Sequence, residues 1–154
     1  MNTELQDLID SFLKILDLYS LINRKPVDYG TGDLLYFTEI HTITVIGRNR
    51  EINITRLAEL MGVTKGAISQ TVKKLAGKNL IVRSKTENKR EVILRLSEKG
   101  KTAYKRQKSL QKEIFTFARK LYKKGTPKQR EMVRRLFDEI IRNLMMRLEA
   151  CEKA

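Results

Sequence analysis

One short stretch, residues 64–75, combines residue types and spacing that suit a binding surface. At about 100° per residue, Ile68, Val72 and Leu75 share one face of a helix that must pack against the protein. Gly66 lies on the opposite face, where it costs about 1 kcal/mol relative to alanine. That cost is understandable if the backbone must approach another surface closely. The side chains available for binding are Thr64, Lys65, Gly66, Ser69, Gln70, Lys73 and Lys74.

The functional groups on this helix match the edges and backbone of double-stranded DNA. Gln70 has the two-atom geometry that binds adenine in the major groove, and Ser69 suits several bases. Thr64 and the N-terminus of the helix suit a phosphate group. An ordinary solvated helix face is the alternative interpretation, but the neighbouring elements fit it less well.

Charge and composition point to the same class of partner. The 154 residues contain 32 Lys and Arg against 18 Asp and Glu, a formal net charge of +14. Such an excess indicates nucleic acid or an anionic membrane surface. No apolar run is long enough to span a bilayer, there is no tryptophan, and the acidic N-terminus does not resemble a signal peptide. We therefore expect a soluble, cytoplasmic protein of one domain that does not bind membranes.

The sequence offers little for catalysis or for a bound cofactor. A single cysteine, Cys151, excludes an internal disulfide, and a single histidine, His41, leaves little for a zinc site. We found no paired-carboxylate motif, no glycine-rich phosphate loop and no nucleophile with a base partner. The prediction is a protein that is not an enzyme and that has no metal or cofactor.

Periodicity and capping residues predict a mostly helical chain with one hairpin. Helices are expected over 4–22, from an N-cap at Thr38 to a stop at Gly47, over 53–62 and 65–77, from Ser97 to about Lys124, and from a capping box at Thr126 to about Ala150. The segments LIVRS and REVILRLS read as two strands around the polar turn KTENK. This order of elements is that of a winged helix-turn-helix preceded and followed by long helices.

The run TEIHTITVIG…INITRLAELMGVTKGAISQTVKKLAGKNLIVRSKTENKREVILRLSEKGK resembles the MarR family of bacterial transcription regulators. The helix-turn-helix half of this run is common to many DNA-binding proteins. The ending, a wing followed by Leu-Ser-x-Lys-Gly, is more specific. The resemblance covers residues 36–101 closely, and the flanking helices agree with the family in length and order.

The resemblance implies roles for several residues of this chain. The family's base-reading pair falls on Ser69 and Gln70, and its minor-groove arginine at the tip of the wing falls on Arg90. Lys85 and Lys89 would contact phosphates. The family usually carries Asp-x-Arg at the tip, whereas this chain has Asn88 in place of the aspartate, so the residue that steadies Arg90 lacks a charge.

Many members of the family bind a small-molecule effector between the dimer helices and the DNA-binding lobe. In this chain such a pocket would be lined by Tyr19, Tyr36 and His41, although packing of aromatic rings explains these residues equally well. A helix-cap role is also open for His41.

The predicted fold class is mainly α with a small β-hairpin wing (α+β), a winged helix-turn-helix flanked by N- and C-terminal dimerisation helices. Residues 33–100 would form the DNA-binding lobe, and residues 1–32 and 101–154 would form the dimerisation helices. The expected function is a sequence-specific, homodimeric repressor that binds a pseudo-palindromic operator and is released by an effector. The alternative is a winged-helix protein that binds DNA or RNA without sequence preference.

Overall fold

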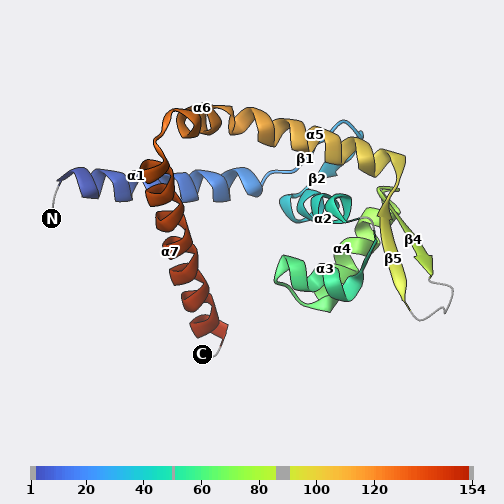
Figure 1. Cartoon of the computed structure of the whole chain (residues 1–154). Helices are drawn as coiled ribbons and strands as arrows, with labels where there is room; N and C mark the ends of the chain where they lie inside the picture. The colour runs from blue at the N-terminus through green and yellow to red at the C-terminus, as the bar shows by residue number, and fades with distance from the viewer. Residues whose placement is uncertain (1–2, 50, 86–90, 153–154) are drawn as a thin grey trace. The chain divides into compact units, whose positions relative to one another are not determined.

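The computed structural model describes residues 3–49, 51–85 and 91–152, which form two compact units, Met1–Leu110 and Gln111–Ala154 (Figure 1). The helices are α1 (Thr3–Asn23), α2 (Phe37–Arg48), α3 (Ile54–Met61), α4 (Lys65–Gly77), α5 (Glu98–Ile114), α6 (Thr116–Lys124) and α7 (Pro127–Glu152). The strands are β1 (Val27–Asp28), β2 (Leu34–Leu35), β3 (Ile52–Asn53), β4 (Ile81–Lys85) and β5 (Val92–Leu96). This mainly helical fold with a small antiparallel sheet confirms the predicted fold class.

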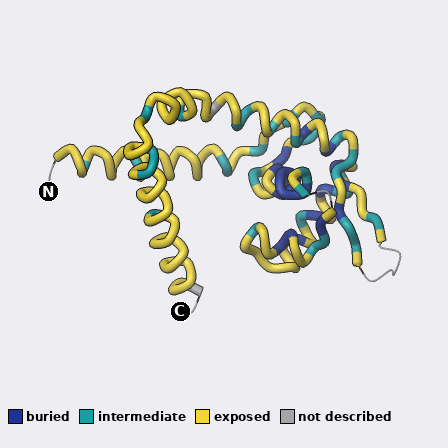
Figure 2. Tube along the Cα trace, viewed as in Figure 1, coloured by how far each residue is buried: buried dark blue, intermediate teal, exposed yellow. Residues whose placement is uncertain are grey.

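The hydrophobic core lies in the first unit, among α2, α3, α4 and the strands that follow them (Figure 2). Ile43 of α2, Leu57 of α3 and Leu75 of α4 are fully buried in it, as is Leu94 of β5. Burying each such side chain contributes about 1.5–3 kcal/mol. The core therefore holds the helix-turn-helix and the strands together as one body.

The turn between α3 and α4 is set by local chemistry. The side chain of Asn53 accepts a hydrogen bond from the amide of Arg56, and that of Thr64 accepts one from Ala67. These two caps begin the helices. Gly62 ends α3 with φ of 63°, a left-handed conformation that glycine adopts without steric cost.

The predicted hairpin is present as β4 and β5, which pair antiparallel from Ile81 opposite Leu96 to Lys85 opposite Val92. The sequence did not predict β3, which pairs with the other edge of β5 and gives the order β3-β5-β4. A two-residue strand has too few residues to show an alternating pattern. The short β1–β2 pair was missed for the same reason.

Three predicted helix boundaries were wrong. The N-cap of α2 is Tyr36 rather than Thr38, and the Glu39 carboxylate accepts the Tyr36 amide at 2.9 Å. α2 ends at Arg48, one residue beyond the predicted stop at Gly47, where a Cβ atom would lie 2.7 Å from the ring of Tyr104. The long helix predicted to run without interruption to Lys124 is broken at Phe115 into α5 and α6.

The junction between the wing and α5 is tightly packed. The hydroxyl of Ser97 accepts the Gly100 amide at 3.0 Å, which caps α5, and donates to the carbonyl oxygen of Asn79. The backbone amide of Ser97 donates to the Leu80 carbonyl oxygen. A Cβ atom on Gly100 would lie 1.9 Å from that same oxygen. Close approach of α5 to this turn therefore requires glycine at position 100.

The second unit and α1 are largely uncovered in the single chain (Figure 2). Within α7, a stripe of large apolar side chains is exposed: Met132, Val133, Leu136, Phe137, Ile141, Leu144, Met145, Met146 and Leu148. The capping box that begins α7 is as predicted, with Thr126 and Gln129 bonding each other's amides. None of the residues of α1 is buried. No helix among the described residues is both long and apolar enough to cross a membrane.

Candidate nucleic-acid interface

Helix α4 is anchored by one face and presents the other to solvent. Ile68, Val72 and Leu75 are buried in the core, as the sequence predicted. Their burial against α2 and α3 fixes which side chains face outward. The predicted binding residues Lys65, Gly66, Ser69, Gln70, Lys73 and Lys74 are all exposed, and so is the N-cap, Thr64.

Gly66 is not required by the packing of the protein. A Cβ atom there would meet nothing closer than the Thr64 hydroxyl at 3.9 Å, which is an ordinary contact. Its backbone is helical, so no positive φ favours glycine. Glycine in an exposed helix without a packing or conformational reason leaves a bare stretch of backbone on the outward face of α4.

The hairpin supplies a second basic surface. Arg83 and Lys85 are exposed on β4, and Arg95 of β5 pairs with Glu51 beside β3. Lys89 and Arg90, the predicted tip residues, lie outside the described residues, as does Asn88.

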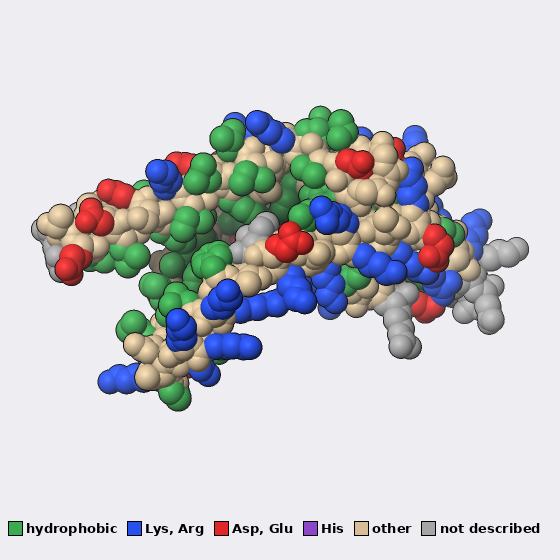
Figure 3. All heavy atoms as spheres, turned by 90° about the horizontal axis from the view of Figure 1, so that it is seen from above, with side chains coloured by type: hydrophobic (Ala, Val, Ile, Leu, Met, Phe, Trp, Pro, Cys, Tyr) green, Lys and Arg blue, Asp and Glu red, His purple; other side chains and the backbone are tan. Residues whose placement is uncertain are grey.

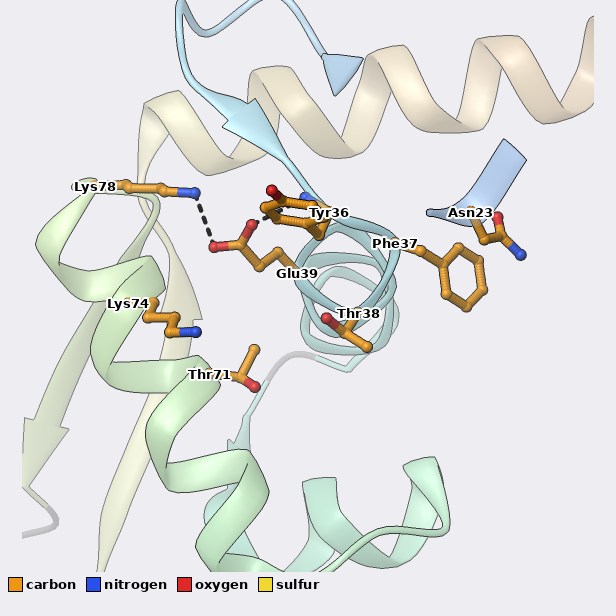
Figure 4. Close-up of a pocket in the computed structure, with 8 residues that line it drawn as sticks. All are labelled: Asn23, Tyr36, Phe37, Thr38, Glu39, Thr71, Lys74 and Lys78. Carbon is orange, nitrogen blue, oxygen red and sulfur yellow. Dashed lines mark hydrogen bonds and ion pairs between the residues drawn. The ribbon is translucent and has the colours of Figure 1, made fainter. Parts of the chain in front are cut away.

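A hollow of about 480 Å³ lies beside α4, between the start of α2 and the end of α1 (Figure 4). The α4 side chains that line it are Thr71, Lys74 and Lys78, and the remaining lining residues are Asn23, Tyr36, Phe37, Thr38 and Glu39. The hollow combines aromatic rings with two lysines and one carboxylate. These groups suit a small molecule that has an apolar part and a negative charge.

A partly buried ion pair forms one wall of this hollow. Lys78 Nζ lies 2.8 Å from Glu39 Oε1 and also donates to the carbonyl oxygen of Leu34 at 3.0 Å (Figure 4). Glu39 is the only buried residue with a charged side chain in the described part of the chain. Its carboxylate is satisfied by Lys78 and the Tyr36 amide, as a buried charge requires.

Of the three residues predicted for an effector pocket, Tyr36 lines the hollow, whereas Tyr19 and His41 each contact Phe37, another of its lining residues. The Tyr19 ring meets Phe37 edge-on at 5.9 Å between centroids, and the His41 ring stacks on it at 5.6 Å. Partial burial lowers the pKa of His41, and the charge of Arg48 lowers it further. The imidazole is therefore neutral at neutral pH.

Sequence reasoning missed Phe37, Glu39 and Lys78 as members of this region. Glu39 follows Tyr36 by three residues, the spacing of a helix-capping glutamate, and this was the available signal. Its pairing with Lys78, 39 positions further along the chain, has no local signature. Within the described ranges, no group of three or more His, Cys, Asp and Glu side chains is arranged to hold a metal ion.

The fold and the exposed α4 face define a winged helix-turn-helix protein, and comparison with known proteins finds similar ones. Residues 35–92 match the model of the MarR family. The uncharacterized HTH-type transcriptional regulator YhjH of Bacillus subtilis (strain 168) is 35% identical over 104 residues. That alignment covers 64% of this chain but only 59% of the length of YhjH.

Solved structures share the fold over nearly the whole chain. Wild-type ZitR of Lactococcus lactis in complex with DNA has a TM-score of 0.74 at 19% identity, covering 93% of this chain and 99% of ZitR. FabT of Streptococcus pneumoniae in complex with DNA has a TM-score of 0.69 at 20% identity, with coverages of 91% and 97%. Residues 35–92 of this chain thus resemble the MarR family, and the chain shares the fold of ZitR and FabT.

Proposed function

We propose that the protein is a cytoplasmic, homodimeric, sequence-specific DNA-binding regulator rather than an enzyme, and that it acts as a repressor. The observation that carries this proposal is the outward face of α4, where Gly66, Ser69 and Gln70 stand exposed between lysines. Short polar side chains suit base edges, and lysines suit phosphates. The DNA complexes of ZitR and FabT, which have the same fold, support this choice of partner.

In the proposed complex, α4 enters the major groove and the hairpin lies over the adjacent minor groove. Gln70 and Ser69 read bases, while Thr64, Lys65, Lys73 and Lys74 hold the backbone. Lys85, Lys89 and Arg90 of the wing provide the second contact, with Arg90 in the minor groove.

Dimerisation is proposed to use the uncovered apolar faces of α1 and α7. Large exposed apolar patches are uncommon on soluble monomers and mark interaction surfaces. Charge adds pairing preference, because residues 1–40 carry a net charge of −4 and residues 101–154 carry +10. Figure 3 shows acidic side chains gathered at the N-terminal end of α1 and uncovered hydrophobic side chains further along the surface.

Relief by an effector is proposed to act through the hollow beside α4. A ligand bound there would contact Lys74 and Lys78 on the helix that reads DNA and Tyr36 at the start of α2. A ligand shifts an equilibrium only by its difference in affinity between two states. This ligand would therefore lower DNA affinity if it binds more tightly to a state in which α4 is displaced.

Selecting bound sites from a pool of random duplexes tests the proposed function. We expect enrichment of one pseudo-palindromic site whose half-sites are one helical turn apart, about 34 Å. Binding without enrichment of any sequence would favour the alternative, a basic winged-helix protein that binds nucleic acid without sequence preference. That alternative is suggested by the net charge of +14.

A further inference from the structure

Lys78 directly follows α4 and would be counted from the sequence as one more lysine for DNA phosphates. The structure places its ammonium group elsewhere. The group points toward the start of α2, where it bonds the Glu39 carboxylate (Figure 4). It also bonds the Leu34 carbonyl oxygen. Only 30% of the Lys78 side chain and 6% of the Glu39 side chain are exposed. Both charged groups therefore bond to other groups of the protein.

These bonds join three elements at one point. Leu34 belongs to β2, Glu39 lies in the first turn of α2, and Lys78 is the C-cap of α4. The second carboxylate oxygen of Glu39 accepts the Tyr36 amide, which fixes the carboxylate against the start of α2. The Lys78 ammonium group and the Glu39 carboxylate are thus each held by two directional hydrogen bonds.

We propose that Glu39 and Lys78 are a positioning pair, which fixes the orientation of α4 and thereby sets DNA affinity without touching DNA. This inference rests on the proposed function of α4 as the DNA-reading helix. Glu39 and Lys78 thus share a positioning role, which cannot be inferred from the net charge of the surface.

The physical reason is a difference in directionality between the contacts of α4. Ile68, Val72 and Leu75 hold the helix through apolar packing, which is strong but non-directional. The charge-assisted hydrogen bonds of Lys78 are short and directional, and they act at the end of the helix. A helix of 13 residues is about 20 Å long, so a small rotation about its buried face displaces the outward side chains. Hydrogen bonds to bases tolerate only a few tenths of an ångström.

If Lys78 binds phosphate, neutralising Lys78 or Glu39 should affect DNA affinity and its salt dependence differently than if Lys78 positions α4. If Lys78 contacts phosphate, Lys78→Met should reduce the salt slope of binding by about 0.9 per subunit. Glu39→Gln should then leave affinity unchanged or raise it, because it removes negative charge. If the pair positions α4, both variants should weaken binding, and neither should change the salt slope.

The experiment measures the affinity of the full-length protein for its selected duplex, over a series of salt concentrations. We expect Glu39→Gln and Lys78→Met each to weaken binding about tenfold or more, as when one partner of a buried ion pair is lost. The double variant should be no weaker than the worse single one, because the two residues act as a unit. Lys78→Arg keeps the charge and should restore most of the affinity.

Two matched controls calibrate these results. Glu59→Gln neutralises an exposed acidic residue of α3 and should leave affinity within about twofold of wild type, as expected for a surface charge. Lys73→Met neutralises an exposed lysine of α4 and should reduce the salt slope. A loss of slope in Lys78→Met, or unchanged affinity in Glu39→Gln, would overturn the positioning role.

Amide hydrogen exchange of the free protein provides a readout that does not need DNA. Glu39→Gln retains an oxygen for the Tyr36 amide, so the start of α2 should be preserved. We expect faster exchange at the last turn of α4 in Glu39→Gln and Lys78→Met, on the order of tenfold, with wild-type rates in Lys78→Arg. Unchanged exchange in both neutral variants contradicts the inference, whereas a wild-type protein that binds no duplex contradicts only the proposed function.

Discussion

Gly66 is the single residue at which the needs of the fold and the proposed function differ most clearly. The fold would accept alanine there, because the added Cβ atom meets only an ordinary contact. Helix propensity would even favour it. We therefore attribute the glycine to the surface that α4 approaches, not to the packing beneath it.

Gly66→Ala should separate stability from binding. Unfolding in urea should show a free energy raised by up to about 1 kcal/mol, from helix propensity. Affinity for the selected duplex should fall about tenfold, equivalent to 1.4 kcal/mol, because the methyl group blocks close approach. Gly77→Ala, at the other end of α4 and also free of contacts, serves as the control and should not affect DNA affinity. Unchanged affinity in Gly66→Ala would remove the reason given for this glycine.

Gln70 and Lys73 should differ in the kind of binding that they support. Gln70→Ala should cost about 1–3 kcal/mol on the selected site and relax the choice of base at one position in each half-site. Lys73→Ala should weaken all duplexes by a similar factor and reduce the salt slope by about one unit per subunit. Binding measured by fluorescence anisotropy on single-base variants of the site checks both. If Gln70→Ala keeps the wild-type base preference, α4 does not recognise bases through this residue.

At the residue scale, the sequence predicted the exposed face of α4 because helical periodicity is a local property. Once Ile68, Val72 and Leu75 were assigned to the core, the opposite side chains followed by geometry. The Glu39–Lys78 pair could not be predicted in this way, since nothing local couples α2 to the end of α4. The pair between Lys99 and Asp33 is another contact of this kind.

At the scale of elements, the contact between the turn at Leu80 and the start of α5 depends on glycine at position 100, which has no side chain. The Leu80 carbonyl oxygen accepts the Ser97 amide and lies against Gly100. The wing is thereby fixed to α5 through backbone contacts. The Ser-x-x-Gly spacing at the end of the wing is visible in the sequence. Hydrophobic periodicity alone does not explain why glycine is needed there.

Gly100→Ala should destabilise the protein by about 1–3 kcal/mol, the usual cost of overpacking, because its Cβ atom would overlap a backbone oxygen that cannot rotate away. Urea denaturation followed by circular dichroism measures the loss. Gly77→Ala again provides the comparison, since it adds the same methyl group in open space and should not destabilise. Equal stability of Gly100→Ala and wild type would show that α5 does not approach Leu80 this closely.

The errors at element boundaries also have a physical cause. Gly47 was predicted to end α2 because glycine costs about 1 kcal/mol in a helix, and the helix ends one residue later, at Arg48. Glycine at position 47 also leaves room for the ring of Tyr104. Thr38 was predicted as the cap from its residue type, whereas Glu39 stabilises the same helix end through the Tyr36 amide. Propensity identified these helices, and tertiary contacts decided where they begin and end.

For the whole molecule, the uncovered apolar faces of α1 and α7 decide the proposed assembly. Deleting residues 1–22 should give monomers or aggregates that bind the selected duplex poorly, although the winged helix itself remains. Sedimentation equilibrium measures the mass, and Asp10→Asn in the full-length chain provides a control that changes only an exposed charge of α1. A truncated protein that stays dimeric and binds tightly would exclude α1 from the dimer interface.

The central claim, that this protein reads DNA sequence, is tested most directly by one ratio of affinities. The measurement compares the selected duplex with a scrambled duplex of the same length and composition, at physiological salt. A specific regulator should prefer its site by at least about 10³-fold. Affinities that agree within a few-fold, with the same steep salt dependence, would show that the basic surfaces bind nucleic acid without reading it.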